Sequence, residues 1–383
     1  MDGTQKKSVE TLYRIQKSIN TFPVKIWNHR AIAWDNKIIV WGGWTRDDIT
    51  GGCYPRDPSL LYCHHSGEWI RQQTEGDIPP NKDPELPLNI FEAVDDKIIL
   101  GTLEFESVYS LDLVTWTWTK LKSSGPPQPD GVIGMSSWIY DGNIYCFGGK
   151  SYPSQTYFND LFCYNPSQQS WELVVQMGDL PSPRFFQKVI INADTAFLFG
   201  GRELGVEDED HLNDLYTLDM KSMHWTKIHD EVATPNGESI LPEHYSCSTL
   251  TRLSHSTAVL MSSRFNVELD EYEYECWLLD LERARELKDP SHIWTQVTNH
   301  FQVCYNAPIL DPVSQSLWLI GGNDCQGGGF TSDVLKITPV NASLKDLVLD
   351  HIARNMSSDD ARLLPDQIPS ELKTAIMVHK NKI

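Results

Sequence analysis

The motif KIIVWGG at 37–43 decides the fold, because the same kind of apolar strand runs into a glycine pair at three later places in the chain. The later copies are NIYCFGG at 143–149, TAFLFGG at 195–201 and SLWLIGG at 316–322. A strand that recurs in this way indicates repeated sheets, since each sheet buries its apolar faces only against its neighbours. The repeat therefore predicts a fold of repeated sheets and the face on which their loops lie.

Each repeat continues in the same order after its glycine pair. A loop leads to a strand such as NDLFCYN at 159–165, and a turn then leads to a tryptophan. The tryptophans are Trp69, Trp118, Trp171, Trp225 and Trp294. Four strands per unit, at intervals near the ~50 residues of a kelch repeat, resemble the kelch family over about residues 27–338. The resemblance implies a β-propeller.

Two further units lack the glycine pair. KIILGTL at 97–103 and TAVLMSS at 257–263 place Gly101-Thr102 and Ser262-Ser263 where the glycines would stand. With these two the count of units is six, and the sequence predicts an all-β fold, a six-bladed kelch β-propeller. The 24 Gly and 22 Pro residues fit many turns better than long helices.

The last unit has its glycine pair and the strand SDVLKIT at 332–338, but no closing tryptophan follows. A propeller pairs its first and last blades so that no strand edge stays open. We therefore expect TLYRIQ at 11–16, which alternates apolar and polar residues, to supply the outer strand of the last blade. The expected domains are an N-terminal segment with this ring-closing strand (1–26), the propeller (27–338) and a short C-terminal α-helical segment (339–383).

The charge of the chain argues against several classes of partner. Its 383 residues carry a net charge of −20, and such a field repels the phosphates of nucleic acids and anionic lipids. No apolar stretch approaches the ~20 residues that cross a bilayer, and the N-terminus lacks a signal-peptide core. We expect a cytoplasmic or nuclear protein that binds neither nucleic acid nor membranes.

The eight cysteines are dispersed and form no metal-binding knuckle. Cys146 and Cys163 fall in predicted strands and are expected to be buried thiols. The sequence contains no phosphate-binding loop, nucleophile elbow or zinc-protease motif, and His64-His65 have no ligand spacing. We expect no cofactor, no metal and no catalytic residues.

The residue after each glycine pair marks one ring position, because equivalent positions of successive blades surround the central channel. In chain order this position holds Trp44, Leu103, Lys150, Arg202, Arg264 and Asn323. Three neighbouring cations at one mouth predict a site for an anionic group such as a C-terminal carboxylate, held by charge-assisted hydrogen bonds. Alternatively, Lys150 and Arg264 are ordinary loop charges, and Arg202 pairs with the acids that follow it.

The first and fourth strands add residues near the same mouth. They suggest Tyr245 and Ser246 as ligand contacts, whereas Arg184 in PSPRFF is expected to serve internal packing. Phe158 and Trp44 would supply apolar walls, although aromatic residues in repeat loops more often pack within a blade.

From Ser343 onward the pattern becomes helical, with apolar residues along one stripe. This tail resembles the VHL-type box of cullin-2 ubiquitin ligase receptors, in which a first helix binds Elongin C and a Leu-Pro segment addresses cullin-2. The matching residues are Leu344, Leu347, Val348 and Ile352 in the first part and Leu364, Pro365 and Ile368 in the second. The alternative is a helical pair that packs on the propeller and has no partner.

A propeller followed by such a box resembles the kelch-domain-containing receptors that read C-terminal degrons. The resemblance implies a substrate-recognition subunit that binds C-terminal peptides, recruits Elongin B/C and cullin-2, and leaves catalysis to the ligase. In that family an arginine directly after a glycine pair holds the terminal carboxylate, and Arg202 has that place. A second family arginine would fall near His211 and a Ser-Trp pair near His244-Tyr245, which departs from diglycine specificity. The alternatives are a non-catalytic scaffold and a metal-dependent propeller enzyme.

Overall fold

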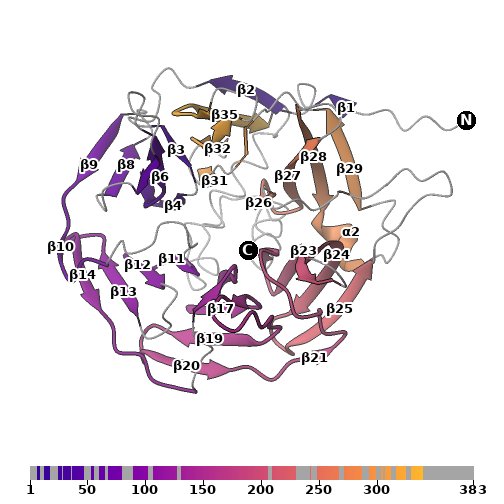
Figure 1. The fold of residues 1–383 in the computed structure, drawn as a ribbon, viewed down its shortest axis with the longest axis horizontal. Coiled ribbons are helices and arrows are strands. Elements are labelled where there is room, and N and C mark those ends of the chain that lie inside the picture. The colour runs from indigo at the N-terminus through magenta and orange to yellow at the C-terminus, as the bar shows by residue number, and fades with distance from the viewer. Residues whose placement is uncertain are drawn as a thin grey trace, which may run out of the picture.

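The computed structural model describes most of the chain between Lys7 and Pro339. The described residues are 7–8, 13–17, 25–27, 29–35, 37–46, 53–55, 60–64, 68–79, 89–101, 107–126, 131–205, 209–229, 242, 248–266, 271–286, 293–298, 303–304, 307–311, 316–324 and 329–339. They form a ring of β-sheets around a central axis (Figure 1). The innermost strands of successive sheets lie beside one another all the way around this ring.

Five blades each take four strands from one continuous stretch of chain, in sequence order from the axis outward. Blade 1 has β4 (Arg30–Trp34), β5 (Lys37–Trp41), β8 (Leu60–His64) and β9 (Trp69–Gln72). Blade 2 has β11 (Ile90–Val94), β12 (Lys97–Gly101), β13 (Val108–Asp112) and β14 (Thr117–Lys120). Blade 3 has β16 (Ser136–Tyr140), β17 (Asn143–Phe147), β19 (Leu161–Asn165) and β20 (Ser170–Leu173). Blade 4 has β22 (Lys188–Asn192), β23 (Thr195–Leu204), β24 (Glu209–Asp219) and β25 (His224–His229). Blade 5 has β26 (Thr249–Arg252), β27 (Thr257–Asn266), β28 (Glu271–Asp280) and β29 (Trp294–Thr298).

The prediction of six blades is corrected, because in the described part of the chain five blades are continuous units. The sheet that completes the ring is a composite of β31 (Ala307–Asp311), β32 (Ser316–Ile320), β35 (Val334–Pro339) and the N-terminal β2 (Tyr13–Lys17). β2 runs antiparallel to β35, with Tyr13 opposite Pro339 and Lys17 opposite Leu335. An uncovered β35 would leave a row of unpaired backbone groups at the ring junction. The opposite end of the chain covers this edge, close to where the closing strand is expected.

The helical part of the fold prediction also needs correction. The one α-helix among the described residues is α2 (Leu281–Glu286), which lies between β28 and β29. Asp280 Oδ1 caps it by accepting hydrogen bonds from the backbone N of Glu282 at 3.1 Å and of Arg283 at 2.9 Å. The expected C-terminal helices fall in residues 340–383, outside the described residues. Within the described part, no helix has the length and apolar character needed to cross a membrane.

The glycine pairs lie where one blade meets the next. Gly148 and Gly149 have φ values of 72° and 101°, a region that favours glycine. The Gly149 amide donates to the Arg184 carbonyl oxygen at 2.8 Å, and a Cβ on Gly148 would lie 2.7 Å from the same oxygen. The last pair acts in the same way across the ring junction, where Gly322 N donates to Ile26 O at 2.7 Å. Side chains are excluded because the backbone that enters the next blade occupies their space.

An aromatic residue directly before a glycine pair packs on the tryptophan of the next blade. The ring centroids are 5.1 Å apart for Trp41 and Trp118, 5.2 Å for Phe147 and Trp225, and 5.3 Å for Phe199 and Trp294. All six side chains are buried. The strand ending in two glycines and the later tryptophan are therefore the two halves of one contact between blades.

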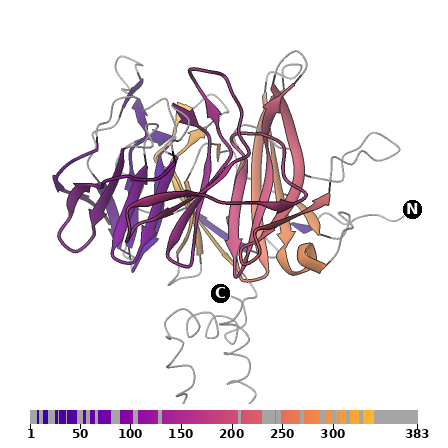
Figure 2. The same ribbon diagram turned by 90° about the horizontal axis from the view of Figure 1, so that it is seen from below.

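Beyond the glycine pairs, short strands build up one face of the ring. Three short strands follow glycine pairs, namely β6 (Trp44–Arg46), β18 (Lys150–Ser151) and β33 (Asn323–Asp324). They pair in that order with β3 (Ile26–Trp27), β15 (Val132–Ile133) and β30 (Val303–Cys304). A third strand extends the first and last of these sheets, β7 (Cys53–Pro55) beside β6 and β34 (Gly329–Phe330) beside β33. In blades 4 and 5 this region is the tip of the long hairpins β23–β24 and β27–β28, which rise above the ring in Figure 2. We call this side the hairpin face.

Linkers between blades cover outer edges of the sheets. β10 (Glu75–Gly76) runs parallel to β14, and β21 (Met177–Gly178) runs parallel to β25. The N-terminal β1 (Lys7–Ser8) runs parallel to β29 in the same manner. Each of these blades thereby gains a fifth strand.

Deleting residues 1–17, which include β1 and β2, should lower the melting temperature, because the composite sheet then keeps an open edge at β35. We expect a fall of about 5 °C or more in calorimetry. Deleting only residues 1–6, which precede β1, is the control and should leave the melting temperature close to that of the full chain. Equal melting temperatures for the two truncations would contradict closure by β2.

Candidate functional site

The hairpin face brings Lys150 of blade 3 and Arg202 of blade 4 to one aromatic residue, Phe185. Lys150 Nζ lies 5.4 Å from the centroid of the Phe185 ring. Arg202 and Phe185 exchange two backbone hydrogen bonds, with N to O distances of 2.9 and 3.0 Å. Two of the three residues predicted to line the mouth with cations therefore contact Phe185, Lys150 through its ammonium group and Arg202 through its backbone.

Lys150 is positioned by two aromatic rings. Its Nζ lies 4.9 Å from the centroid of the Tyr157 ring as well as above Phe185. The two rings pack edge to face, with centroids 5.5 Å apart and planes at 80°. Cation–π contacts of this kind contribute about 0.5–1 kcal/mol each at exposed sites. They hold the ammonium group in a defined place beside the two rings.

Arg202 lies within a strand, although the sequence pattern places the residue after a glycine pair in a loop. β23 continues through its glycine pair with a bulge between Phe199 and Gly201, and Arg202 then stands opposite His211 of β24. The Arg202 side chain is half-buried. Its position is therefore set by a β-ladder, which is a firmer support for a binding residue than a loop.

Arg184 has the structural role expected from the sequence. Its side chain is 1 % exposed, and it holds the Asp214 carboxylate with Nη1–Oδ1 at 2.6 Å and Nη2–Oδ2 at 2.9 Å. Further hydrogen bonds run from Nη1 to the Gly200 carbonyl oxygen at 3.0 Å and from Nε to the Ser182 carbonyl oxygen at 3.1 Å. This prediction is confirmed: the guanidinium group joins the linker to the third strand of blade 4.

The other predicted mouth residues are spread more widely. Phe158 packs against the apolar core between blades 2 and 3, and Trp44 lies in β6 opposite Trp27 and Pro55. Arg264 lies in β27 opposite Glu273. Tyr245 and Ser246, and the tail residues Leu344, Leu347, Val348, Ile352, Leu364, Pro365 and Ile368, fall outside the described residues.

Sequence reasoning missed a charged pair on the inner strands. Ser137 Oγ on β16 donates to Glu92 Oε1 on β11 at 2.6 Å. Burial raises the pKa of Glu92, while the Ser137 hydrogen bond and the charge of Arg30 on β4 lower it. The sequence signal is a glutamate inside the otherwise apolar run IFEAV at 90–94.

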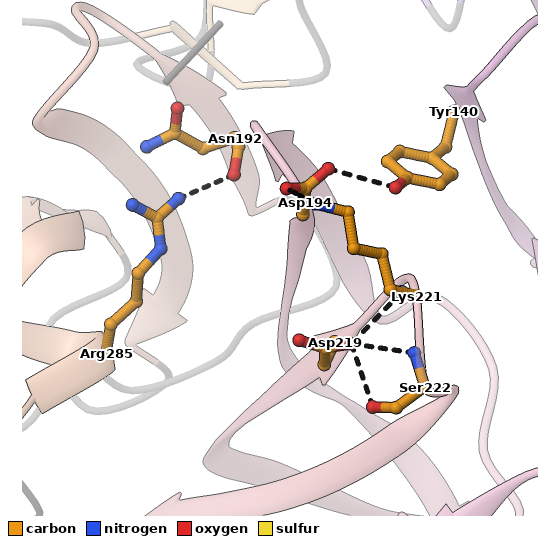
Figure 3. A network of polar contacts seen from close by, with 7 residues as sticks. All are labelled: Tyr140, Asn192, Asp194, Asp219, Lys221, Ser222 and Arg285. Carbon is orange, nitrogen blue, oxygen red and sulfur yellow. Dashed lines mark hydrogen bonds and ion pairs between the residues drawn. The ribbon is translucent and has the colours of Figure 1, made fainter. Parts of the chain in front are cut away.

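A polar network lies at the strand ends away from the hairpin face (Figure 3). Asp194 accepts hydrogen bonds from Lys221 Nζ at 2.6 Å and from the Tyr140 hydroxyl of blade 3 at 2.9 Å. The Lys221 hydrogen bond holds the pKa of Asp194 below its usual value, whereas burial raises the pKa of Tyr140 to about 12. Arg285 of α2 donates to the Asn192 carbonyl oxygen at 2.5 Å. The network thus joins blades 3, 4 and 5.

Two free thiols lie in blade 3. Among the described residues, no three His, Cys, Asp or Glu side chains gather in a way that could hold a metal ion. Cys146 is fully buried and Cys163 is half-buried, both as free thiols. Burial raises the pKa of Cys146 well above its usual value, which keeps this thiol protonated and unreactive.

Comparison with known proteins identifies the repeat. The sequence profile described as the KLHDC2/KLHL20/DRC7 Kelch-repeats domain matches residues 28–253. Kelch domain-containing protein 1 from Homo sapiens is 26% identical over 253 residues, covering 59% of this chain and 60% of that protein. Host cell factor 2 from Homo sapiens is 26% identical over 238 residues, covering 55% of this chain and 28% of that protein. The chain thus spans less than two thirds of the length of these relatives.

A solved structure shares the fold alone. The structure of YjhT superposes with a TM-score of 0.56 and 15% identity, covering 84% of this chain and 99% of that chain.

Replacing Asp214 with Asn should destabilise the protein strongly, because the buried Arg184 guanidinium loses its counter-charge. Breaking a buried pair from one side costs about 3–5 kcal/mol. The matched control is Asp35→Asn, since Asp35 is 64% exposed and 3.6 Å from Lys37 Nζ. Denaturant unfolding measures both variants, and equal losses of stability would contradict the structural role of Arg184.

Proposed function

The chain belongs to the KLHDC2/KLHL20/DRC7 Kelch-repeats domain family, and we propose that its hairpin face captures the C-terminal carboxylate of a partner peptide. The kelch repeat is consistent with a protein-interaction scaffold. One observation carries the finer proposal, namely the meeting of Lys150 and Arg202 at Phe185 in a chain whose net charge is −20. Two cationic residues placed on either side of Phe185 in a chain of that charge are suited to an anionic ligand.

The two cations offer complementary chemistry. The planar guanidinium of Arg202 can donate two parallel hydrogen bonds to one carboxylate, whereas the Lys150 ammonium adds a compact charge with freely rotating donors. Tyr157, which is half-buried, lies beside the ammonium and presents part of its ring, whereas Phe185 is buried beneath it. The last side chain of a bound peptide would pack on the Tyr157 ring while its carboxylate contacts the cations. His211, opposite Arg202, is a further donor on the same hairpin.

The proposal extends to a role as the substrate receptor of a cullin-2 ubiquitin ligase. Its support is the sequence of the tail, in which Leu344, Leu347, Val348 and Ile352 match an Elongin-binding helix and Leu364, Pro365 and Ile368 match a cullin-2 segment. In this arrangement the propeller selects the substrate and the tail delivers it to the ligase. The simpler alternative is a scaffold that binds partners without recruiting a ligase.

Arg202→Ala should weaken binding of peptides with a free C-terminus at least ~10-fold, since charge-assisted hydrogen bonds contribute about 1.5–3 kcal/mol. The probe is a pool of peptides with random C-terminal residues, each prepared as the free acid and as the amide and measured by fluorescence anisotropy. Amidation should cause a loss similar to that of Arg202→Ala. Lys97→Ala removes an exposed cation at the start of β12, away from the hairpin face, and should bind as the wild type does.

Two outcomes distinguish the alternatives for the peptide site. Equal binding of acid and amide peptides would rule out carboxylate capture and would favour a scaffold that recognises internal sequences. A loss of binding in the Lys97→Ala control would mean that overall charge, not the pair at Phe185, attracts the peptides.

Leu344→Asp should abolish co-purification of Elongin B/C and cullin-2 with the full-length chain, because it places a charge on the predicted apolar stripe. Leu349→Asp is the matched control, since Leu349 lies off that stripe. Reconstitution from purified components provides the measurement. If the wild-type chain binds no Elongin B/C, or if Leu344→Asp binds as well as Leu349→Asp, the ligase role is wrong.

A further inference from the structure

The linkers that enter blades 2 and 4 cover the outer edges of those blades in the same way, with a glycine that packs against the tryptophan carbonyl. Gly76 and Gly178 have φ values of 85° and 84°, and each presses so closely on the carbonyl of the blade's tryptophan that a Cβ would overlap its oxygen. The next residue then donates to that carbonyl oxygen, at 2.9 Å from Asp77 N to Trp118 O and at 3.0 Å from Asp179 N to Trp225 O.

In both blades the aspartate also caps the edge. Asp77 Oδ2 accepts a hydrogen bond from the outward-facing backbone N of Lys120 at 3.0 Å. Asp179 Oδ2 does the same for Lys227 N at 3.3 Å. Each capped residue stands two positions after the blade tryptophan. A carboxylate over the first free N–H prevents another strand from pairing there, which is one way in which proteins protect sheet edges.

Blade 3 lacks this cap. Its linker places Gly125 against the Trp171 carbonyl oxygen, as in blades 2 and 4, and Ser124 O accepts from Trp171 N at 2.6 Å. The residue at the aspartate position is Pro126, which has neither a carboxylate nor a backbone N–H. The position equivalent to Lys120 and Lys227 is Leu173.

The backbone N–H of Leu173 points away from blade 3. Val174 N donates inward to Leu161 O at 2.8 Å, and donors alternate along a strand, so the Leu173 donor faces outward. The Leu173 side chain is 50% exposed, and no acceptor for its N–H occurs among the described residues. Within the described residues, β20 therefore ends in an open edge.

Exposed apolar side chains follow this open edge along the rim between blades 3 and 4. Besides Leu173, Val175 is 82% exposed, Met177 is 51% exposed and Leu180 is 45% exposed. Four large apolar residues within eight positions are unusual on a solvated rim, where single exposed apolar residues are the norm. We call the outward edge of β20 together with these four side chains the β20 rim.

The charge around the β20 rim indicates the kind of partner. The exposed charged residues within the segment are Glu172 and Asp179, both acidic. A second copy of the chain would bring these acids together and would add another net charge of −20, so self-association is disfavoured. A partner strand with lysine or arginine beside its apolar residues is complementary.

We propose that the β20 rim is a second peptide-binding site, at which an extended segment of a partner protein adds a strand to the edge of blade 3. The partner donates and accepts backbone hydrogen bonds at Leu173, packs alternating apolar side chains on the rim and places basic residues near Glu172 and Asp179. The site lies on the outer circumference of the ring and does not depend on the proposed carboxylate site of the hairpin face.

The test uses peptides that cannot occupy a carboxylate site. The probe is a pool of seven-residue peptides, acetylated at the N-terminus and amidated at the C-terminus, in which Val, Ile or Leu alternates with Lys or Thr. Binding to the full chain is measured by fluorescence anisotropy, and backbone amide exchange is followed by NMR. We expect members of the pool to bind and to protect the Leu173 amide, which in the free protein exchanges faster than the capped amides of Lys120 and Lys227.

Two variants close the edge in different ways. Pro126→Asp installs the cap found at Asp77 and Asp179, and Leu173→Pro removes the outward N–H without breaking the inner ladder. Both should weaken peptide binding at least 10-fold, whereas Leu173→Ala, which keeps the N–H, should weaken it less than Leu173→Pro does. Val114→Asp is the matched surface control, because Val114 is 69% exposed on blade 2, and it should bind as the wild type does.

Two results would contradict the strand-addition site. If no capped peptide in the pool binds, or if Pro126→Asp binds as tightly as the wild type while the melting temperature is unchanged, the strand-addition site is wrong. Should Leu173→Pro fail to fold, the comparison of Pro126→Asp with Val114→Asp still decides the question.

Discussion

Direct backbone packing where one blade meets the next, which we call the seam, is the constraint on which the rest of the structure depends. At the seam of blades 3 and 4, the amide of Gly149 donates to the carbonyl oxygen of Arg184. The Arg184 side chain is locked to Asp214 inside blade 4, so this hydrogen bond fixes the position of one blade against the next. The adjacent Phe185 is placed by the same segment, and Lys150 and Arg202 meet there. The geometry of the candidate site therefore follows from the seam.

Both proposed binding sites lie at departures from the repeat. The repeated features, which are the glycine pair, the aromatic residue before it and the tryptophan of the next blade, all serve contacts between blades. The residue after the glycine pair is free to vary, and in blades 3 and 4 it is a cation. Pro126 is a departure of the same kind at the outer rim, where blades 2 and 4 carry aspartate.

The sequence predicted the propeller and the packing role of Arg184, because both follow from the repeat. The missing outer strand of the last unit predicted closure by a strand near the N-terminus, and the aligned repeats placed Lys150 and Arg202 at equivalent positions of neighbouring units. The composite build of the last sheet and the continuation of β23 through its glycine pair depend on strand pairing between distant segments, which periodicity does not show. The Glu92 pair and the open edge at Leu173 were missed because each is defined by a residue on another blade or linker.

The most direct test of the account is the peptide affinity of Gly149→Ala, which leaves Lys150 and Arg202 unchanged and alters only the seam. A Cβ at this position would lie 2.5 Å from Val132 Cγ1 and 2.7 Å from Met135 Cγ, and the φ of 101° is unfavourable for alanine. Gly142→Ala is the control, since its φ is 71° but nothing lies within 4 Å of the added Cβ. The account predicts that Gly149→Ala lowers the melting temperature and the affinity for free C-terminal peptides well below the values of Gly142→Ala. Wild-type affinity in a folded Gly149→Ala protein would contradict it.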